Sequence, residues 1–186
     1  MPPAEPVPAS EPPRKQAAVL LPVHRGHEGA LHLTLVRRST GGRHGGQLAF
    51  PGGNREPADA DLRATALREA QEEIGLHPDD VDIVAELPPV NTRTTLFQVF
   101  PFIGRLRQPT GQWQLQAAEI EGVVDVSLDY LTGPGVRQEK ELSFPTWPEP
   151  RLVQVIPLGT GDLLWGLTLR IIDAALPRLT QVGVSI

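Results

Sequence analysis

One long helical pattern interrupts an otherwise strand-like chain and constrains its fold more than any other feature. Over residues 59–74, apolar residues recur every three or four positions and form a single stripe. They are Leu62, Ala66, Leu67, Ala70 and Ile74. Asp59 or Asp61 is a suitable N-cap, and Gly75 is a stop signal. Because such a stripe must be buried, we expect this helix to pack against a sheet.

Short apolar or alternating runs on both sides of the helix supply the strands of that sheet. They are residues 17–23, 31–36, 48–50, 81–87, 97–103, 121–126 and 152–156. A second helical pattern covers residues 163–176, and we expect Pro177 to end it. The order predicts an α/β (α+β) fold, in which helices flank a mixed sheet.

The first residues differ from the rest in composition. Residues 1–13 contain six prolines, which favours a disordered leader over residues 1–15 and one domain over residues 16–186. A proline-rich ligand for a partner module is the alternative. His24 and His27, between the first two strands, are interpreted as solvated loop residues.

Composition excludes several classes of function. The chain has no cysteine, which removes disulfides, thiolate catalysis and cysteine-based metal sites. Its net charge is −5 without a lysine- or arginine-rich block, so we expect no nucleic-acid partner. Its apolar runs are too short to span a bilayer, and no secretory signal is present, so we expect no membrane partner and a cytoplasmic location.

Three glutamates on the long helix are the candidate site. Glu69, Glu72 and Glu73 stand at positions i, i+3 and i+4 and share one face beside the apolar stripe. Like charges so placed repel, and a hard cation such as Mg²⁺ or Mn²⁺ would relieve the repulsion. Arg68 could brace one of the carboxylates. For the glutamates alone, a solvated acidic face is the other interpretation.

The sequence around these glutamates resembles the Nudix box, G-x5-E-x7-R-E-U-x-E-E-x-G-U with U apolar. Its second half is matched by Arg68, Glu69, Ala70, Glu72, Glu73, Gly75 and Leu76. In the first half the expected acid falls on Ala60 and the expected glycine on Asn54, so the loop has one extra residue. Asp59 or Glu56 is then the stand-in for that acid. The resemblance implies a Nudix-like α/β/α sandwich.

Residues before the helix resemble the extra signature of the coenzyme A pyrophosphatase branch of this family. The matching residues are Arg38, Ser39, Arg43, Gly46 and the run Phe50–Gly53. The resemblance makes Arg38 and Arg43 candidates for binding an extra phosphate, because guanidinium groups offer forked donors. Without the resemblance, these arginines could simply be surface residues of a hairpin. Trp165 is interpreted as core packing.

The resemblance implies hydrolysis of a nucleoside diphosphate linked to another moiety. Glu69, Glu72 and Glu73 would hold Mg²⁺ or Mn²⁺, and Gly52 and Gly53 would let a phosphate approach the backbone. The resemblance makes Glu72, Glu73, Arg68 and Glu119 the catalytic candidates. Glu119 aligns with a late glutamate that reaches the metals or acts as general base. Glu121 is its rival, and both could be surface charges.

Three functions follow from these motifs. The first is conversion of coenzyme A to 3′,5′-ADP and 4′-phosphopantetheine. The second is hydrolysis of ADP-ribose, dinucleoside polyphosphates or (d)NTPs, which lack the 3′-phosphate and pantetheine. The third is a non-catalytic nucleotide-binding module. All three take a small nucleotide as partner, and because relatives often dimerise, a homodimer is a further expectation.

Overall fold

The computed structural model describes residues 14–26, 29–41, 45–92, 96–107, 112–144 and 147–182. The strands are β1 (Lys15–Arg25), β2 (Leu31–Arg38), β3 (Leu48–Ala49), β4 (Gly52–Asn54), β5 (Val81–Glu86), β6 (Val90–Asn91), β7 (Phe97–Leu106), β8 (Ile120–Ser127), β9 (Gln138–Leu142), β10 (Arg151–Pro157) and β11 (Leu163–Trp165). The helices are α1 (Leu62–Ile74), the short 3₁₀ helix η1 (Pro78–Asp80), α2 (Leu128–Thr132) and α3 (Gly166–Val182).

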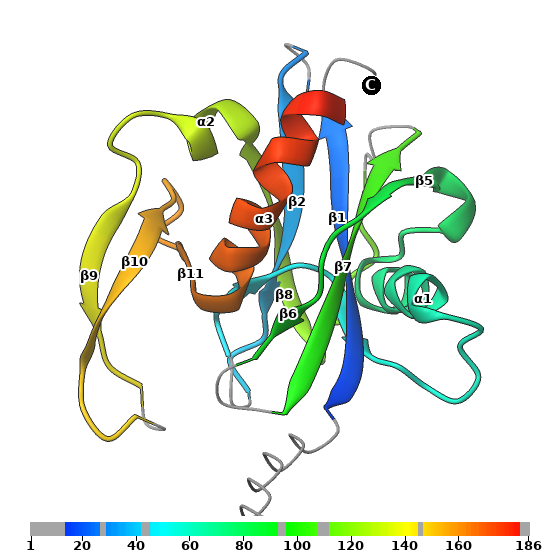
Figure 1. The fold of residues 1–186 in the computed structure, drawn as a ribbon, viewed down its shortest axis with the longest axis horizontal. Helices are drawn as coiled ribbons and strands as arrows, with labels where there is room; N and C mark the ends of the chain where they lie inside the picture. Colours follow the sequence, from blue (N-terminus) through cyan, green and yellow to red (C-terminus); the bar gives the residue numbers. More distant parts are fainter. Residues whose placement is uncertain are drawn as a thin grey trace, which may run out of the picture.

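The main sheet is mixed, as the sequence predicted. Its central path runs β3-β2-β1-β7-β5, while β4, β6 and β8 pair with β1, β7 and β2 respectively. Strands β1 and β7 are parallel, and the other pairs within this sheet are antiparallel. A separate sheet of β11, β10 and β9 lies beside α3 (Figure 1).

Alternation along β1 separates two hydrophobic cores. Ala17, Leu21 and Val23 pack in one core with α3, whereas Ala18 and Leu20 pack in the other with α1. Because successive side chains of a strand point to opposite faces, the two helices lie on opposite sides of the sheet. The predicted α/β/α sandwich is therefore confirmed, and α1 places its polar side beside strand β4.

Two predictions about the second helix are wrong. Leu163–Trp165 form β11, and α3 begins at Gly166 and continues through Pro177. Pro177 lies on the exposed side, while Ala175 and Leu179 remain buried. Packing of this apolar side compensates for the backbone hydrogen bond that proline cannot donate.

Two further predictions concern single residues. His24 belongs to β1 and not to a loop, and its side chain is only 13% exposed. Trp165 is half-buried, stacked on Phe144 and edge-on to Trp147. His27 and most of the proline-rich leader, residues 1–13, lie outside the described residues. In the part of the chain that is described, no helix is long and apolar enough to cross a membrane.

Candidate active site

Capping residues fix both ends of α1 and thereby the direction in which its glutamates project from the helix axis. The Asp61 carboxylate accepts the backbone N–H of Ala64 at 2.7 Å, so Asp61 is the N-cap and the helix begins three residues later than predicted. At the other end Gly75 has a φ of 71°, a left-handed conformation that favours glycine. The N–H of Leu76 returns to the Ala70 carbonyl and closes the turn.

Asp59 contacts Arg68 instead of capping the helix. Arg68 donates from Nε to Oδ1 of Asp59 at 2.9 Å and from Nη2 to Oδ2 at 3.1 Å. The Thr65 hydroxyl and the Glu56 N–H also donate to Oδ2, both at 2.8 Å. The Arg68 hydrogen bonds hold the pKa of Asp59 well below its usual range, and Asp59 raises the pKa of Arg68. Of the two candidate acids, the structure therefore brings Asp59 to the arginine.

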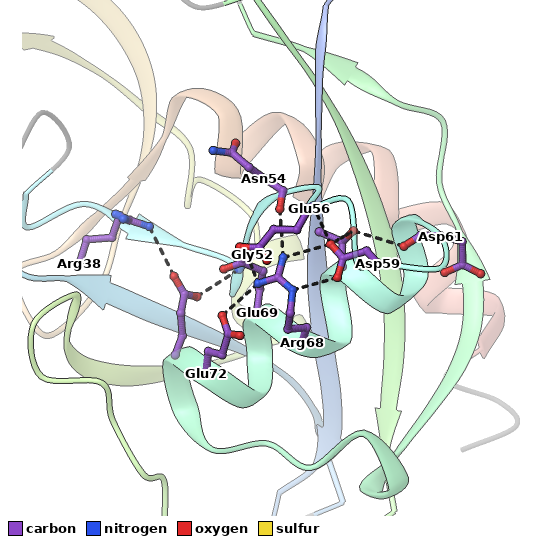
Figure 2. A network of polar contacts seen from close by, with 11 residues as sticks. Arg38, Gly52, Asn54, Glu56, Asp59, Asp61, Arg68, Glu69 and Glu72 are labelled. Carbon is purple, nitrogen blue, oxygen red and sulfur yellow. Dashed lines mark hydrogen bonds and ion pairs between the residues drawn. The ribbon is translucent and has the colours of Figure 1, made fainter.

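Arg68 connects this acid to the helix glutamates and to the preceding strand. Its Nη1 lies 3.1 Å from Oε1 of Glu69 and 3.0 Å from Oε2 of Glu72. Its Nη2 donates to the Asn54 carbonyl at 3.0 Å. Figure 2 shows the guanidinium at the centre of these contacts. Arg68 thus ties the end of β4, the loop after it and α1 into one unit.

Glu73 is the buried member of the glutamate group. It is 3% exposed, accepts the Gly52 N–H at 3.1 Å, and lies 3.6 Å from Nη1 of Arg38. Burial raises the pKa of Glu73 to about 7, and the charges of Glu69 and Glu119 act in the same direction. The Gly52 N–H and Arg38 oppose that shift. The positive charge around Glu73 is therefore too small to offset its burial, and the carboxyl ionises at a higher pH than a free glutamate does.

Glu69 lies directly against the second glycine of β4. A Cβ atom at Gly53 would lie 2.4 Å from Oε1 of Glu69, so only glycine leaves room for this carboxylate. Burial raises the pKa of Glu69, and Arg68 opposes the shift. Each glycine thus accommodates one carboxylate: Gly52 donates its N–H to the buried Glu73, and Gly53 leaves space for the half-buried Glu69.

The segment leading into β8 brings Glu119 to the same side of α1. The N–H groups of Gln114 and Gln116 donate to the carbonyls of Ile74 and Glu73, which anchors the segment along the end of the helix. The negative charge of Glu119 raises the pKa of both Glu69 and Glu73. Its rival Glu121 acts instead on Arg37. The structure therefore brings Glu119 to the helix glutamates.

The arginines of the upstream hairpin have different surroundings. Arg37 is held by Asp162 through two contacts, from Nε at 2.9 Å and from Nη2 at 2.5 Å. Asp162 was not predicted, because a partner 125 residues away leaves no signal in the sequence. Arg38 faces Glu73, and Arg43 lies outside the described residues.

The glutamates fit a divalent cation in chemistry but are not arranged as a finished cage. Within the described ranges, no three acidic or histidine side chains already converge on one point. Glu72 is 59% exposed and turns toward Arg68. Glu73, however, is buried and Glu69 half-buried, burial raises the pKa of both, and the charge of Glu69 raises that of Glu73 further; such oxygen donors suit a hard cation. The donor set therefore fits Mg²⁺ or Mn²⁺.

The fold and this site define a class: an α/β/α sandwich with a carboxylate-bearing helix next to a double-glycine strand. Comparison with known families agrees, since the model of the NUDIX domain matches residues 13–143. The chain belongs to the Nudix family, whose members generally use divalent metal ions and act on small nucleotide substrates.

Named relatives are similar over much of the chain. Nudix hydrolase 22, chloroplastic, of Arabidopsis thaliana is 38% identical over 87% of this chain and 54% of its own length. Uncharacterized Nudix hydrolase NudL of Cronobacter sakazakii is 44% identical over 62% of this chain and 58% of its own. The chain thus spans little more than half the length of these relatives.

A solved structure shares the fold. The Nudix hydrolase RenU of M. smegmatis matches with a TM-score of 0.60 at 20% identity, covering 93% of this chain and 88% of that one. This similarity supports the architecture.

Proposed function

We propose that this chain is a metal-dependent pyrophosphohydrolase that acts on a nucleoside diphosphate linked to a second moiety. The observation that carries this proposal is the pair of carboxylates of Glu73, which is buried, and Glu69, which is half-buried, held against Gly52 and Gly53. Burying two like charges together is costly unless a positive group compensates them. A cation and the phosphates it binds would supply that compensation.

The proposed roles follow from the contacts. Glu69, Glu72 and Glu73 would hold the metal, which when bound would neutralise the pyrophosphate and lower the pKa of a water. Glu119 would accept the proton of the attacking water, because it is an exposed acid whose charge acts on both Glu69 and Glu73. Arg68, fixed by Asp59, would position Glu69 and Glu72.

The substrate that we propose is coenzyme A, split into 3′,5′-ADP and 4′-phosphopantetheine. Support comes from the upstream signature residues Arg38, Ser39, Arg43, Gly46 and Phe50–Gly53. Of these, Arg38 and Gly52 lie directly at Glu73. We also propose a cytoplasmic location, although the Arabidopsis relative is named chloroplastic.

The test is product analysis by chromatography. The purified protein is incubated in the presence of Mg²⁺ or Mn²⁺ with one substrate at a time: coenzyme A, ADP-ribose, a dinucleoside polyphosphate or a dNTP. Preferred release of 3′,5′-ADP from coenzyme A supports the proposal. Preference for another of these substrates would contradict the coenzyme A assignment alone. Binding without turnover of any of them would contradict the enzymatic proposal.

A further inference from the structure

An open cavity of about 630 Å³ lies where β4 ends beside the starts of β1 and β7. Its wall includes Arg14, Lys15, Arg55, Asn54 and Phe97. Backbone pairing holds these residues together: Lys15 is opposite Phe97 in the β1–β7 pair, and the Arg55 N–H donates to the Gln16 carbonyl at 3.1 Å. The cavity is therefore built on the sheet and not on a loop alone.

The cavity concentrates positive charge in a chain whose net charge is −5. Arg14, Lys15 and Arg55 line it together with a single carboxylate, that of Glu56. Among the described residues, neither Lys15 nor Arg55 forms an ion pair, and the Arg55 guanidinium donates to the Gln16 side chain at 3.3 Å. Cations gathered in this way repel one another, and an anion between them would remove the repulsion.

Phe97 adds an apolar wall to this basic cavity. Phe97 is half-buried and packs against the core at the start of β7. An aromatic ring beside the guanidinium group of an arginine and the ammonium group of a lysine suits a ligand that combines a phosphate with a flat ring system. Nucleotides have both parts.

Strand β4 and the residue after it connect the helix glutamates to the cavity over a span that one bound molecule can cover. Gly52 contacts Glu73, Gly53 contacts Glu69, and Arg55 lines the cavity. Because consecutive Cα atoms are about 3.8 Å apart, Gly52 and Arg55 are separated by at most about 11 Å. Figure 2 shows the Asn54 carbonyl facing Arg68 while its side chain points away from the glutamates.

We propose that this cavity is a subsite for a phosphate monoester on the nucleoside part of the substrate, with the nucleobase against Phe97. The inference rests on the proposed function, since the ligand is the substrate of that site. In this assignment Arg38 does not contact the extra phosphate, because it faces Glu73. Lys15 and Arg55 are the residues that would contact this phosphate.

Direct binding tests the subsite without any turnover. Titration calorimetry in EDTA measures the affinities of 3′,5′-ADP and 5′-AMP for the full chain, for Lys15→Gln/Arg55→Gln, and for the control Lys140→Gln. Lys140 is an exposed cation on β9, outside the cavity. We expect the full chain and the control to prefer 3′,5′-ADP about tenfold, and the double variant to lose that preference with 5′-AMP binding unchanged.

Kinetics provide the second measurement. With coenzyme A, the double variant should have a KM raised about tenfold at unchanged kcat, and dephospho-coenzyme A should show no change. An unaltered preference for 3′,5′-ADP in a double variant with a wild-type melting curve would overturn the subsite. Equal weakening of both ligands would overturn it too. If the preference depends on Lys15 and Arg55 but coenzyme A is not hydrolysed, the subsite stands and the proposed substrate fails.

Discussion

Arg68 donates two hydrogen bonds to Asp59, nine positions earlier in the chain, and this pair joins the loop after β4 to the glutamate-bearing helix. Asp59 is 9% exposed and also accepts the Thr65 hydroxyl and the Glu56 N–H. One carboxylate thus satisfies four donor groups from the loop and the helix. Removing its charge would leave a half-buried guanidinium without its strongest partner.

Asp59→Asn should destabilise the protein by about 2 kcal/mol, because it breaks a charged pair at a buried site while keeping one acceptor oxygen. Urea unfolding followed by circular dichroism measures this change. Asp61→Asn is the matched control, since asparagine caps a helix about as well as aspartate. Equal, small effects of the two substitutions would mean that the Asp59–Arg68 pair contributes little to stability.

Glu73→Gln should remove activity and yet stabilise the metal-free protein at alkaline pH. The pKa of Glu73 is raised to about 7 in the folded protein, from an ordinary value of 4.5. Below the pKa that Glu73 has in the unfolded state, its carboxyl is protonated in both states, and its burial does not lower the free energy of unfolding. As the pH rises toward 7 the unfolded state ionises first, so the folded state loses stability, and above 7 the full cost is present.

Urea unfolding in EDTA at pH 5 and pH 8 tests whether the stability cost of Glu73 increases with pH. The advantage of Glu73→Gln over the wild type should be about 1 kcal/mol at pH 5 and about 3 kcal/mol at pH 8. Glu72→Gln is the control, because Glu72 is 59% exposed and should show no such trend. A wild-type protein that is the more stable one at pH 8 would contradict the burial of an uncompensated carboxylate.

Gly53→Ala should lower kcat by about 10²-fold with little loss of stability, because displacement of a reacting group by about 1 Å has an effect of that size. The new Cβ would lie 2.4 Å from Oε1 of Glu69, a flexible side-chain end that can move aside. Gly41→Ala is the control, since nothing lies within 4 Å of a Cβ there. Steady-state kinetics with the substrate found by product analysis measure both variants. Full activity of Gly53→Ala would show that Glu69 need not stay where the structure places it.

Local patterns predicted the parts of this structure that depend on neighbouring residues. The apolar stripe of α1, its Gly75 stop and the strand runs of the main sheet all follow from short-range periodicity. Pro177 was misjudged because the buried side of α3 continues to Leu179, and tertiary packing outweighs the local preference.

Contacts between distant residues left no comparable signal. The Arg37–Asp162 pair, the cavity between the starts of β1 and β7, and the choice of Glu119 over Glu121 all depend on how strands are brought together. In the candidate site, the grouping of glutamates on one helix face could be predicted. Their different burial could not, because it is set by where the double glycine of β4 lies against α1.

His24 leads to a last prediction, on pH and stability. Its Nε2 lies 3.2 Å from Oδ1 of Asp125 without forming a hydrogen bond, and its ring stacks on His32. The Asp125 carboxylate raises the pKa of His24 more than burial lowers it. Asp125 in turn has a lowered pKa: burial opposes the shift, but His24 and Thr34 outweigh it.

A raised histidine pKa means that the folded state binds the proton more tightly than the unfolded state. The stabilisation is therefore complete below the unfolded pKa near 6.5 and is lost as the pH rises through the folded value. His24→Asn should cost about 1 kcal/mol more at pH 5.5 than at pH 9, measured by urea unfolding. His77→Asn is the control, because it keeps the acceptor that caps η1 and is 58% exposed. If the cost of His24→Asn were the same at both pH values, His24 would contribute by packing, and its attraction to Asp125 would not stabilise the fold.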